Sequence, residues 1–289
     1  MKKYLFYILT ISALMAGCHQ GGKQESAAFS THQLEGKRCF VLIGTEAFPL
    51  AGTVIGLENS YRLAWPDEGL LSSEAEAALI AKCFGDSASS TLAEATEKML
   101  YCTWGYEEYQ SDLQMLELRT DSIADTLPYT YGHVESTCEV EGGLATFIIQ
   151  DEIYSVGAAH GLYSMKYLTV DINTGNVLEL SDLLDTVGLG DIIRMAVEEL
   201  EDNASVREDV FDEFLEAGAF PMPHDFFIDN DLRAIIAVYQ PYEVASYACG
   251  IQNVTLNADW LARHVQFTPK GKQLFGLEDG SSVAEAKRQ

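Results

Sequence analysis

The sequence is poor in basic residues. It contains 18 lysines and arginines against 44 aspartates and glutamates, which gives a formal net charge of −26. A surface this acidic repels nucleic acid and anionic lipid headgroups, because like charges oppose association. The composition therefore excludes a nucleic-acid partner. It leaves two explanations, attraction of basic partners and simple solubility, and composition alone favours solubility.

The sequence also lacks closely spaced cysteines. Six are present, with no Cys-x-x-Cys pair, so the pattern fits neither a zinc site nor a disulfide scaffold. We interpret the internal cysteines as small buried hydrophobic residues, and we expect Cys83 and Cys102 to lie on buried helix faces. The six are Cys18, Cys39, Cys83, Cys102, Cys138 and Cys249.

Common catalytic motifs are missing too. There is no Gly-x-Ser-x-Gly elbow, no His-Glu-x-x-His pair and no P-loop. Four histidines, namely His133, His160, His224 and His264, lack the spacing of metal ligands. We therefore expect no metal and no cofactor, and the balance is against an enzyme.

Long apolar runs are absent except at the start of the chain. Met1-Lys2-Lys3 precedes an apolar run over residues 4–16. The run is shorter than the ~20 residues that span a bilayer and is typical of a secretory signal. Its end, Leu-Met-Ala-Gly-Cys at residues 14–18, is similar to a bacterial lipobox, which implies lipidation of Cys18 and removal of residues 1–17. The alternative is a plain secretory signal with a chance cysteine.

A lipid on Cys18 would place the protein in the bacterial cell envelope, attached to a membrane. His19 occupies the position where an aspartate would retain a lipoprotein in the inner membrane. We therefore expect the outer membrane, facing the periplasm or the cell surface.

The rest of the chain divides by composition and periodicity. Residues 18–34 are polar and small and predict a flexible tether. Residues 35–150 predict an N-terminal α+β module, residues 151–270 a C-terminal module, and residues 271–289 a polar tail. Strands come in runs rather than alternating with helices. The expected class is therefore α+β, with an antiparallel sheet packed by helices and two small modules in tandem.

Local signals predict individual elements. Ser72 or Ser73 begins a helix that ends at Gly85, and a second helix begins at residue 90 or 91. Residues 52–66 predict a hairpin or two short strands turning at Glu58-Asn59. Residues 129–140 and 144–154 alternate like long antiparallel strands.

Two segments carry the most specific pattern. The first, within residues 154–184, contains Gly157-Ala158-Ala159-His160, then Asp171, Thr174-Gly175 and Leu180-Ser181-Asp182-Leu183-Leu184. The second is Tyr-Gln-Pro-Tyr-Glu-Val-Ala-Ser-Tyr-Ala-Cys-Gly at residues 239–250. Both resemble signatures of the RsiV-like family of domains of unknown function, and together they cover roughly residues 150 to 265. The first departs at Ala158, where the family usually has glycine.

RsiV-like domains form the extracytoplasmic part of the anti-sigma factor RsiV and the non-catalytic N-terminal part of the deacetylase PdaC. The resemblance implies a sensing or binding role, which in RsiV is the recognition of lysozyme. The sigma-binding segment, the transmembrane helix and the deacetylase domain of those proteins have no counterpart in this sequence. Neither of their activities is therefore carried over.

The candidate ligand-binding residues are His160, Tyr239, Tyr242, Glu243 and Tyr247. His160 lies between small residues, where it either contacts a ligand or fixes the turn, and the turn-fixing role is favoured. The tyrosines offer apolar rings with polar tips, and together with Glu243 they either contact a ligand or pin a long loop against the sheet. No catalytic residue is assigned.

The leading hypothesis is a cell-envelope lipoprotein with a non-catalytic sensing or binding role. Its expected partners are a basic protein such as a lysozyme, or peptidoglycan fragments. One alternative is a small envelope hydrolase that uses His160 and Glu243, and another is a purely structural envelope protein.

Overall fold

The computed structural model describes most of the chain beyond the expected tether. Cys18, the expected signal segment and Cys102 lie outside the described residues, so the predictions about them stay predictions. The described residues are 29–43, 54–85, 89, 91–100, 130–155, 158–199 and 221–277.

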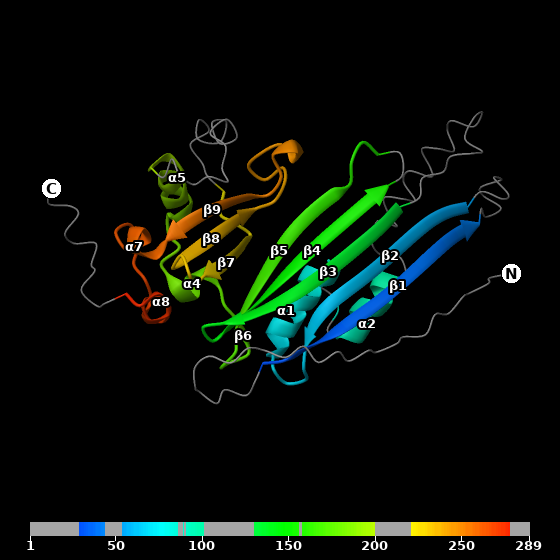
Figure 1. Cartoon of the computed structure of the whole chain (residues 1–289), viewed down its shortest axis with the longest axis horizontal. Coiled ribbons are helices and arrows are strands. Elements are labelled where there is room, and N and C mark those ends of the chain that lie inside the picture. Colours follow the sequence, from blue (N-terminus) through cyan, green and yellow to red (C-terminus); the bar gives the residue numbers. More distant parts are fainter. Residues whose placement is uncertain are drawn as a thin grey trace. The chain divides into compact units, whose positions relative to one another are not determined.

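The fold is α+β, as the sequence predicted (Figure 1). Six strands form one sheet in the order β1-β2-β3-β4-β5-β6, and three form a second sheet in the order β7-β8-β9. The first sheet comprises β1 (Thr31–Ile43), β2 (Val54–Pro66), β3 (Thr130–Glu141), β4 (Leu144–Ser155), β5 (Leu162–Asp171) and β6 (Asn176–Val177). The second comprises β7 (Asp225–Asp229), β8 (Ala234–Tyr239) and β9 (Gln252–Asn257). The helices are α1 (Ser73–Phe84), α2 (Leu92–Leu100), α4 (Leu180–Leu183), α5 (Leu189–Glu199), α7 (Ala258–Leu261) and α8 (Pro269–Phe275), with a 3₁₀ turn η1 (Tyr247–Cys249).

The chain forms two compact units. The first contains residues 1–138 and 149–163, and the second contains residues 139–148 and 164–289. The sequence placed one boundary between residues 150 and 151. In the structure the division instead passes through β3 and β4 and just inside β5, because the tip of the β3–β4 hairpin belongs with the later residues.

In the first unit, β1 and β2 form a long antiparallel pair that runs from Thr31↔Pro66 to Ile43↔Val54. Residues 31–34 are therefore strand, although the sequence predicted tether to residue 34. The hairpin predicted within residues 52–66 is also wrong, because β2 is one continuous strand. Asn59, which was expected at a turn, is fully buried within it.

One strand pair of the large sheet departs from the antiparallel expectation. Strands β2 and β3 are parallel, with Leu57 beside Thr130 and Leu63 beside Ser136. A parallel pair requires a crossover of a dozen or more residues. Residues 67–129, which include α1 and α2, supply that crossover.

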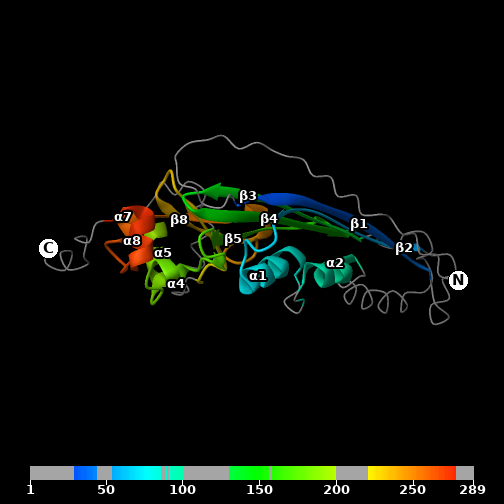
Figure 2. The same cartoon turned by 90° about the horizontal axis from the view of Figure 1, so that it is seen from below.

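Helix α1 has the ends that the sequence indicated. Ser72 is the N-cap and its side chain accepts a hydrogen bond from the Ala75 backbone, while Gly85 ends the helix in the left-handed conformation. Figure 2 shows α1 and α2 on one face of the β1 and β2 strands. Cys83 is buried on the packed face of α1, which confirms that prediction.

The second unit is built around β8. All six residues of β8 are buried, and β7 and β9 pair with it antiparallel on either side. One side contributes to a core with α5, α7 and α8 that includes Ile193, Leu261 and Phe275. Strands buried on both faces read as continuous apolar runs, as β8 does.

Helix α8 extends the folded core into the segment predicted as a polar tail. Phe275 is buried and its ring meets Phe267 edge to face at 5.7 Å. Gly271 lies so close to α4 that a Cβ atom there would stand 2.0 Å from the Leu183 carbonyl oxygen. Residues 271–277 therefore belong to the second unit rather than to a tail.

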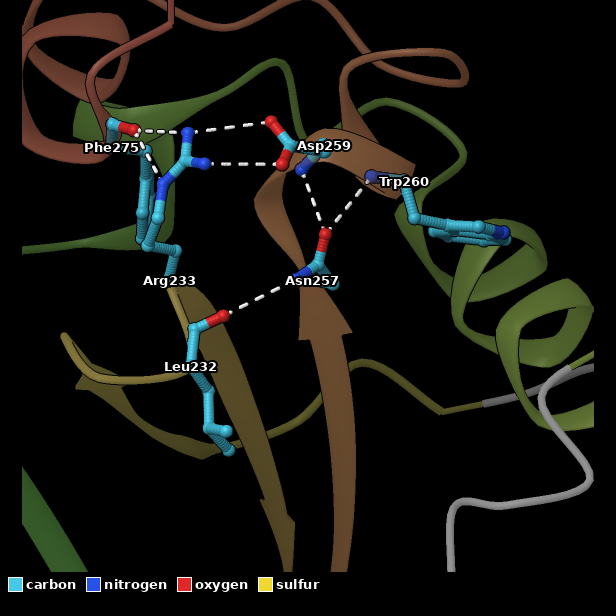
Figure 3. Close-up of polar contacts among 6 residues, drawn as sticks. All are labelled: Leu232, Arg233, Asn257, Asp259, Trp260 and Phe275. Atoms are coloured by element: carbon cyan, nitrogen blue, oxygen red, sulfur yellow. Dashed lines mark hydrogen bonds and ion pairs between the residues drawn. The ribbon is translucent and has the colours of Figure 1, made fainter.

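A polar cluster at the start of β8 and the end of β9 ties α7 and α8 to the sheet (Figure 3). The Arg233 guanidinium contacts the Asp259 carboxylate and donates to the Phe275 carbonyl oxygen at the end of α8. The Asn257 side chain accepts from the backbone of Asp259 and Trp260, and donates to the Leu232 carbonyl oxygen. These contacts satisfy groups that helix ends leave without internal partners.

Candidate functional site

The second signature segment forms a loop that follows β8, which we call the tyrosine loop (residues 240–250). Its first turn is closed by two hydrogen bonds between Gln240 and Glu243. The Glu243 backbone N–H donates to the Gln240 carbonyl oxygen at 3.0 Å, and the Gln240 N–H donates to Glu243 Oε2 at 2.7 Å. The Glu243 carboxylate therefore holds the turn, one of the two roles considered for it from the sequence.

The loop is fastened to strand β5 by the Gln240 side-chain amide. Gln240 Oε1 accepts from the Met165 backbone N–H at 3.0 Å, and Gln240 Nε2 donates to the Met165 carbonyl oxygen at 2.6 Å. The side chain thus pairs with the β5 backbone as a neighbouring strand would. Val244 adds a second anchor, because it is buried in the core of the second unit.

Tyr239 belongs to this core and not to a contact surface. Its side chain is 1% exposed, and its hydroxyl donates to the Pro221 carbonyl oxygen at 3.0 Å. Burial raises the pKa of Tyr239 far above its ordinary value, and the nearby Glu243 charge raises it further. Its inclusion among the ligand-binding candidates is therefore corrected, because a side chain this buried cannot contact a ligand without unfolding β8.

Tyr242 has the opposite placement. It lies between the two anchors with φ of 74°, in the left-handed region that bulky residues rarely adopt. Its side chain is 62% exposed, and its ring centroid lies 5.7 Å from that of Tyr247. The Tyr242 N–H donates to the Ala245 carbonyl oxygen at 2.8 Å, which holds this conformation. Holding a residue there costs roughly 1–3 kcal/mol, and such strain gathers at functional positions.

His160 lies in the first unit, whereas the tyrosine loop lies in the second. The His160 side chain is exposed and its Nδ1 lies 2.8 Å from the Gly161 carbonyl oxygen, so Nδ1–H is the donor. Gly161 is closely packed, because a Cβ there would stand 3.0 Å from the Ile153 carbonyl oxygen. This contact with the adjacent backbone is the one expected of a histidine that fixes a turn.

Sequence reasoning missed a polar group in the first unit. Ser60 Oγ lies 2.9 Å from His133 Nδ1, and His133 Nε2 lies 3.8 Å from Glu135 Oε2. The sequence alone shows that His133 and Glu135 occupy alternate positions of one predicted strand. It does not show the parallel pairing that places Ser60, 73 residues away, beside His133.

Over the described ranges no group of three or more histidine, cysteine, aspartate or glutamate side chains is arranged to hold a metal ion. Among those same residues, no helix combines the length and hydropathy needed to cross a bilayer.

Comparison with known proteins supports the fold. No protein-family model matches the sequence, and neither does any curated protein. A crystal structure of a DUF3298 family member from Bacteroides fragilis is similar, with a TM-score of 0.60 and 20% identity over 86% of this chain and 96% of that one. A DUF3298 family protein from Pseudomonas aeruginosa also matches, with a TM-score of 0.46 and 16% identity over 84% of this chain and 95% of that one. DUF3298 domains are RsiV-like, so the chain shares the fold of an uncharacterised domain family that its sequence signatures resemble.

Proposed function

We propose that this protein is a non-catalytic binding protein of the bacterial cell envelope, and that the tyrosine loop is its contact surface. The observation that carries the proposal is Tyr242, an exposed aromatic side chain held at φ of 74° between two anchored positions. The left-handed conformation of Tyr242 costs stability, so we attribute its presence to a function of the exposed ring. Tyrosine is also enriched in binding surfaces, because its ring buries much area at low entropic cost.

The partner that best fits this surface is a basic, lysozyme-like protein. The net charge is −26, and removal of residues 1–17 would take away Lys2 and Lys3 and make it two units more negative. Opposite charges steer encounter and raise the association rate, and salt screens this effect over a Debye length of ~8 Å at physiological ionic strength. Peptidoglycan fragments are the other partner expected from the sequence.

The hydrolase alternative receives no support from the site. It needs Glu243 and His160 as reacting groups, yet the Glu243 carboxylate accepts from the Gln240 backbone and the His160 ring contacts the adjacent carbonyl. Each side chain is occupied in fixing its own turn.

The binding test uses hen lysozyme as the probe, with cytochrome c as a basic control protein. Biolayer interferometry should show binding of lysozyme, with an association rate that falls steeply as salt is added. Tyr242→Ala should speed dissociation about tenfold, because short-range contacts set the dissociation rate. Tyr131→Ala, an exposed tyrosine of the first unit, is the matched control and should bind normally. Equal binding of both basic proteins, or wild-type kinetics for Tyr242→Ala, would refute the proposal.

The location is tested through Cys18. In the bacterial host, Cys18→Ala should move the protein from the membrane fraction to the soluble envelope fraction, because buried acyl methylenes supply the anchoring free energy, ~0.8 kcal/mol each. Membrane retention of the variant would contradict lipidation. Sucrose-gradient separation of the two membranes tests the expected outer-membrane location of the wild type.

A further inference from the structure

The first unit presents a second exposed surface, on the sheet face opposite to its packed side. Register partners point to the same side of a sheet, so one face can be followed across three strands. It is made of Glu35 and Lys37 on β1, Glu58, Ser60 and Arg62 on β2, and Tyr131, His133 and Glu135 on β3. Tyr154 of β4 adjoins it through its ring contact with Tyr131. We call this set the open face.

The alternate residues of the same strands explain why this face remains exposed. Tyr61, Leu63 and Val134 are buried, and the Tyr61 ring meets Phe84 of α1 edge to face at 5.9 Å. The apolar side of the sheet is therefore packed against the helices. On the open face, the Arg62 side chain is 56% exposed and that of His133 is 43% exposed.

Both cations of the open face are already paired with carboxylates. Lys37 pairs with Glu58. Arg62 lies between Glu35 and Glu135, with its Nε 3.1 Å from Glu35 Oε1 and its Nη1 3.7 Å from Glu135 Oε1. The three carboxylates and two cations of the open face leave a net charge of only −1, in a chain of net charge −26. Because both cations are committed to carboxylates, the face attracts an anionic ligand little, and its small net charge attracts a cationic one little, so an uncharged ligand fits it best.

Two aromatic rings form one end of the open face. The ring centroids of Tyr131 and Tyr154 are 5.3 Å apart and their planes are inclined by 46°. Tyr131 is 39% exposed. The C–H face of a pyranose packs on an aromatic ring, and two adjacent, inclined rings can each receive one of two consecutive sugars.

Polar side chains beside the rings are held in fixed positions. The contact between Ser60 Oγ and His133 Nδ1 orients the imidazole, whose Nε2 lies toward Glu135. These groups supply donors and acceptors for hydroxyl groups. Ester hydrolysis at Ser60 does not fit, because β2 pairs on both sides and its backbone N–H groups are committed to the sheet instead of an oxyanion.

We propose that the open face binds an uncharged oligosaccharide, with consecutive pyranose rings stacked on Tyr131 and Tyr154 and hydroxyl groups bonded to His133, Glu135 and Arg62. This ligand and this surface differ from those of the tyrosine loop. Either assignment can therefore fail while the other stands.

The test is isothermal titration of the purified protein with three neutral hexasaccharides, chitohexaose, cellohexaose and maltohexaose. A hyaluronan hexasaccharide serves as the anionic comparison. At least one neutral probe should bind, with an affinity that salt leaves unchanged. Tyr131→Ala and Tyr154→Ala should each weaken binding about tenfold, as the loss of a stacking ring does elsewhere.

Tyr131→Phe keeps the ring and should retain most of the affinity, which separates stacking from a loss of fold. Val187→Ala in the second unit, at a side chain that is 85% exposed, should bind the hexasaccharide as the wild type does. The proposal is overturned if none of the neutral probes binds, if hyaluronan alone binds, or if both ring-removing variants bind normally.

Discussion

Arg233 and Asp259 form a two-point ion pair that also reaches a helix end. Arg233 Nη1 lies 3.1 Å from Asp259 Oδ2, and Nη2 lies 3.3 Å from Oδ1. The same Nη2 donates to the Phe275 carbonyl oxygen at 2.7 Å (Figure 3). Arg233 therefore binds both an exposed carboxylate and a backbone carbonyl at the end of α8.

The Arg233–Asp259 ion pair and the hydrogen bond from Arg233 to the Phe275 carbonyl should contribute differently to the free energy of unfolding. Arg233→Ala should lower the free energy of unfolding by about 1–3 kcal/mol, because the Phe275 carbonyl loses its charged donor. Asp259→Asn should cost only about 0–1 kcal/mol, since the Asp259 carboxylate is 64% exposed and the ion pair is screened by water. Urea denaturation at neutral pH measures both. Equal losses would mean that the ion pair, and not the carbonyl contact, provides the stability.

Asn257 allows a similar separation at the start of α7. Its Oδ1 accepts from the backbone N–H groups of Asp259 and Trp260, and its Nδ2 donates to the Leu232 carbonyl oxygen at 3.2 Å. Asn257→Ala removes the cap and should cost about 1 kcal/mol. Asn257→Asp keeps the acceptor and should cost less. Equal losses for aspartate and alanine, measured by thermal unfolding, would show that the contact to Leu232 dominates, because both variants lack the Nδ2 donor.

Asp171 predicts a pH dependence. Burial acts to raise its pKa, but the Lys270 ammonium, 2.9 Å from Asp171 Oδ2, and the Asn173 donors outweigh burial and hold the pKa below its ordinary value of 3.8. A lowered pKa stabilises the folded state above the ordinary value, and that stability is lost as the pH falls through the folded-state pKa. Asp171→Asn should therefore be less stable than the wild type at neutral pH, and the difference should shrink below about pH 4.

Lys270→Met tests the cause. Removing the ammonium should move the acid loss of stability to higher pH, because less then opposes protonation of Asp171. Acid unfolding curves of the two variants and the wild type provide the comparison. A stability difference between wild type and Asp171→Asn that stays constant from pH 7 to about pH 2 would contradict the lowered pKa.

Tyr242 predicts a conflict between stability and binding. Tyr242→Gly removes the cost of a left-handed side chain, whereas Tyr242→Ala retains it. The glycine variant should be about 0.5–1 kcal/mol more stable than the alanine variant, after allowance for the added freedom of its unfolded chain. Both should bind lysozyme more weakly than the wild type. If alanine is as stable as glycine, the loop relaxes and Tyr242 is not strained.

The sequence predicted what depends on near neighbours. Ser72 and Gly85 marked the ends of α1, and the apolar spacing placed Cys83 on its buried face. It misplaced what depends on distant segments. Residues Glu58 and Asn59 have the composition of a turn, but pairing with β1 on one side and β3 on the other keeps them in a continuous strand.

The candidate site residues show the same difference between local and long-range effects. All of them lie in or beside the signature segments, yet burial separates Tyr239 from Tyr242, three residues further on. Tyr239 continues the apolar run of β8, and the chain leaves the strand at Gln240. The left-handed conformation of Tyr242 follows from its hydrogen bond to Ala245 and from the burial of Val244. No pattern of residue types shows either.

The passage of β3 and β4 through both units governs the order in which the chain can fold. The first unit needs residues 149–163 to be complete, yet the hairpin tip between its parts, residues 139–148, belongs to the second unit. A ribosome or translocon that releases the chain from its N-terminus therefore delivers no finished unit until residue 163 has emerged. By then residues 139–148 of the second unit have emerged as well. No single cut in the polypeptide therefore separates two complete units.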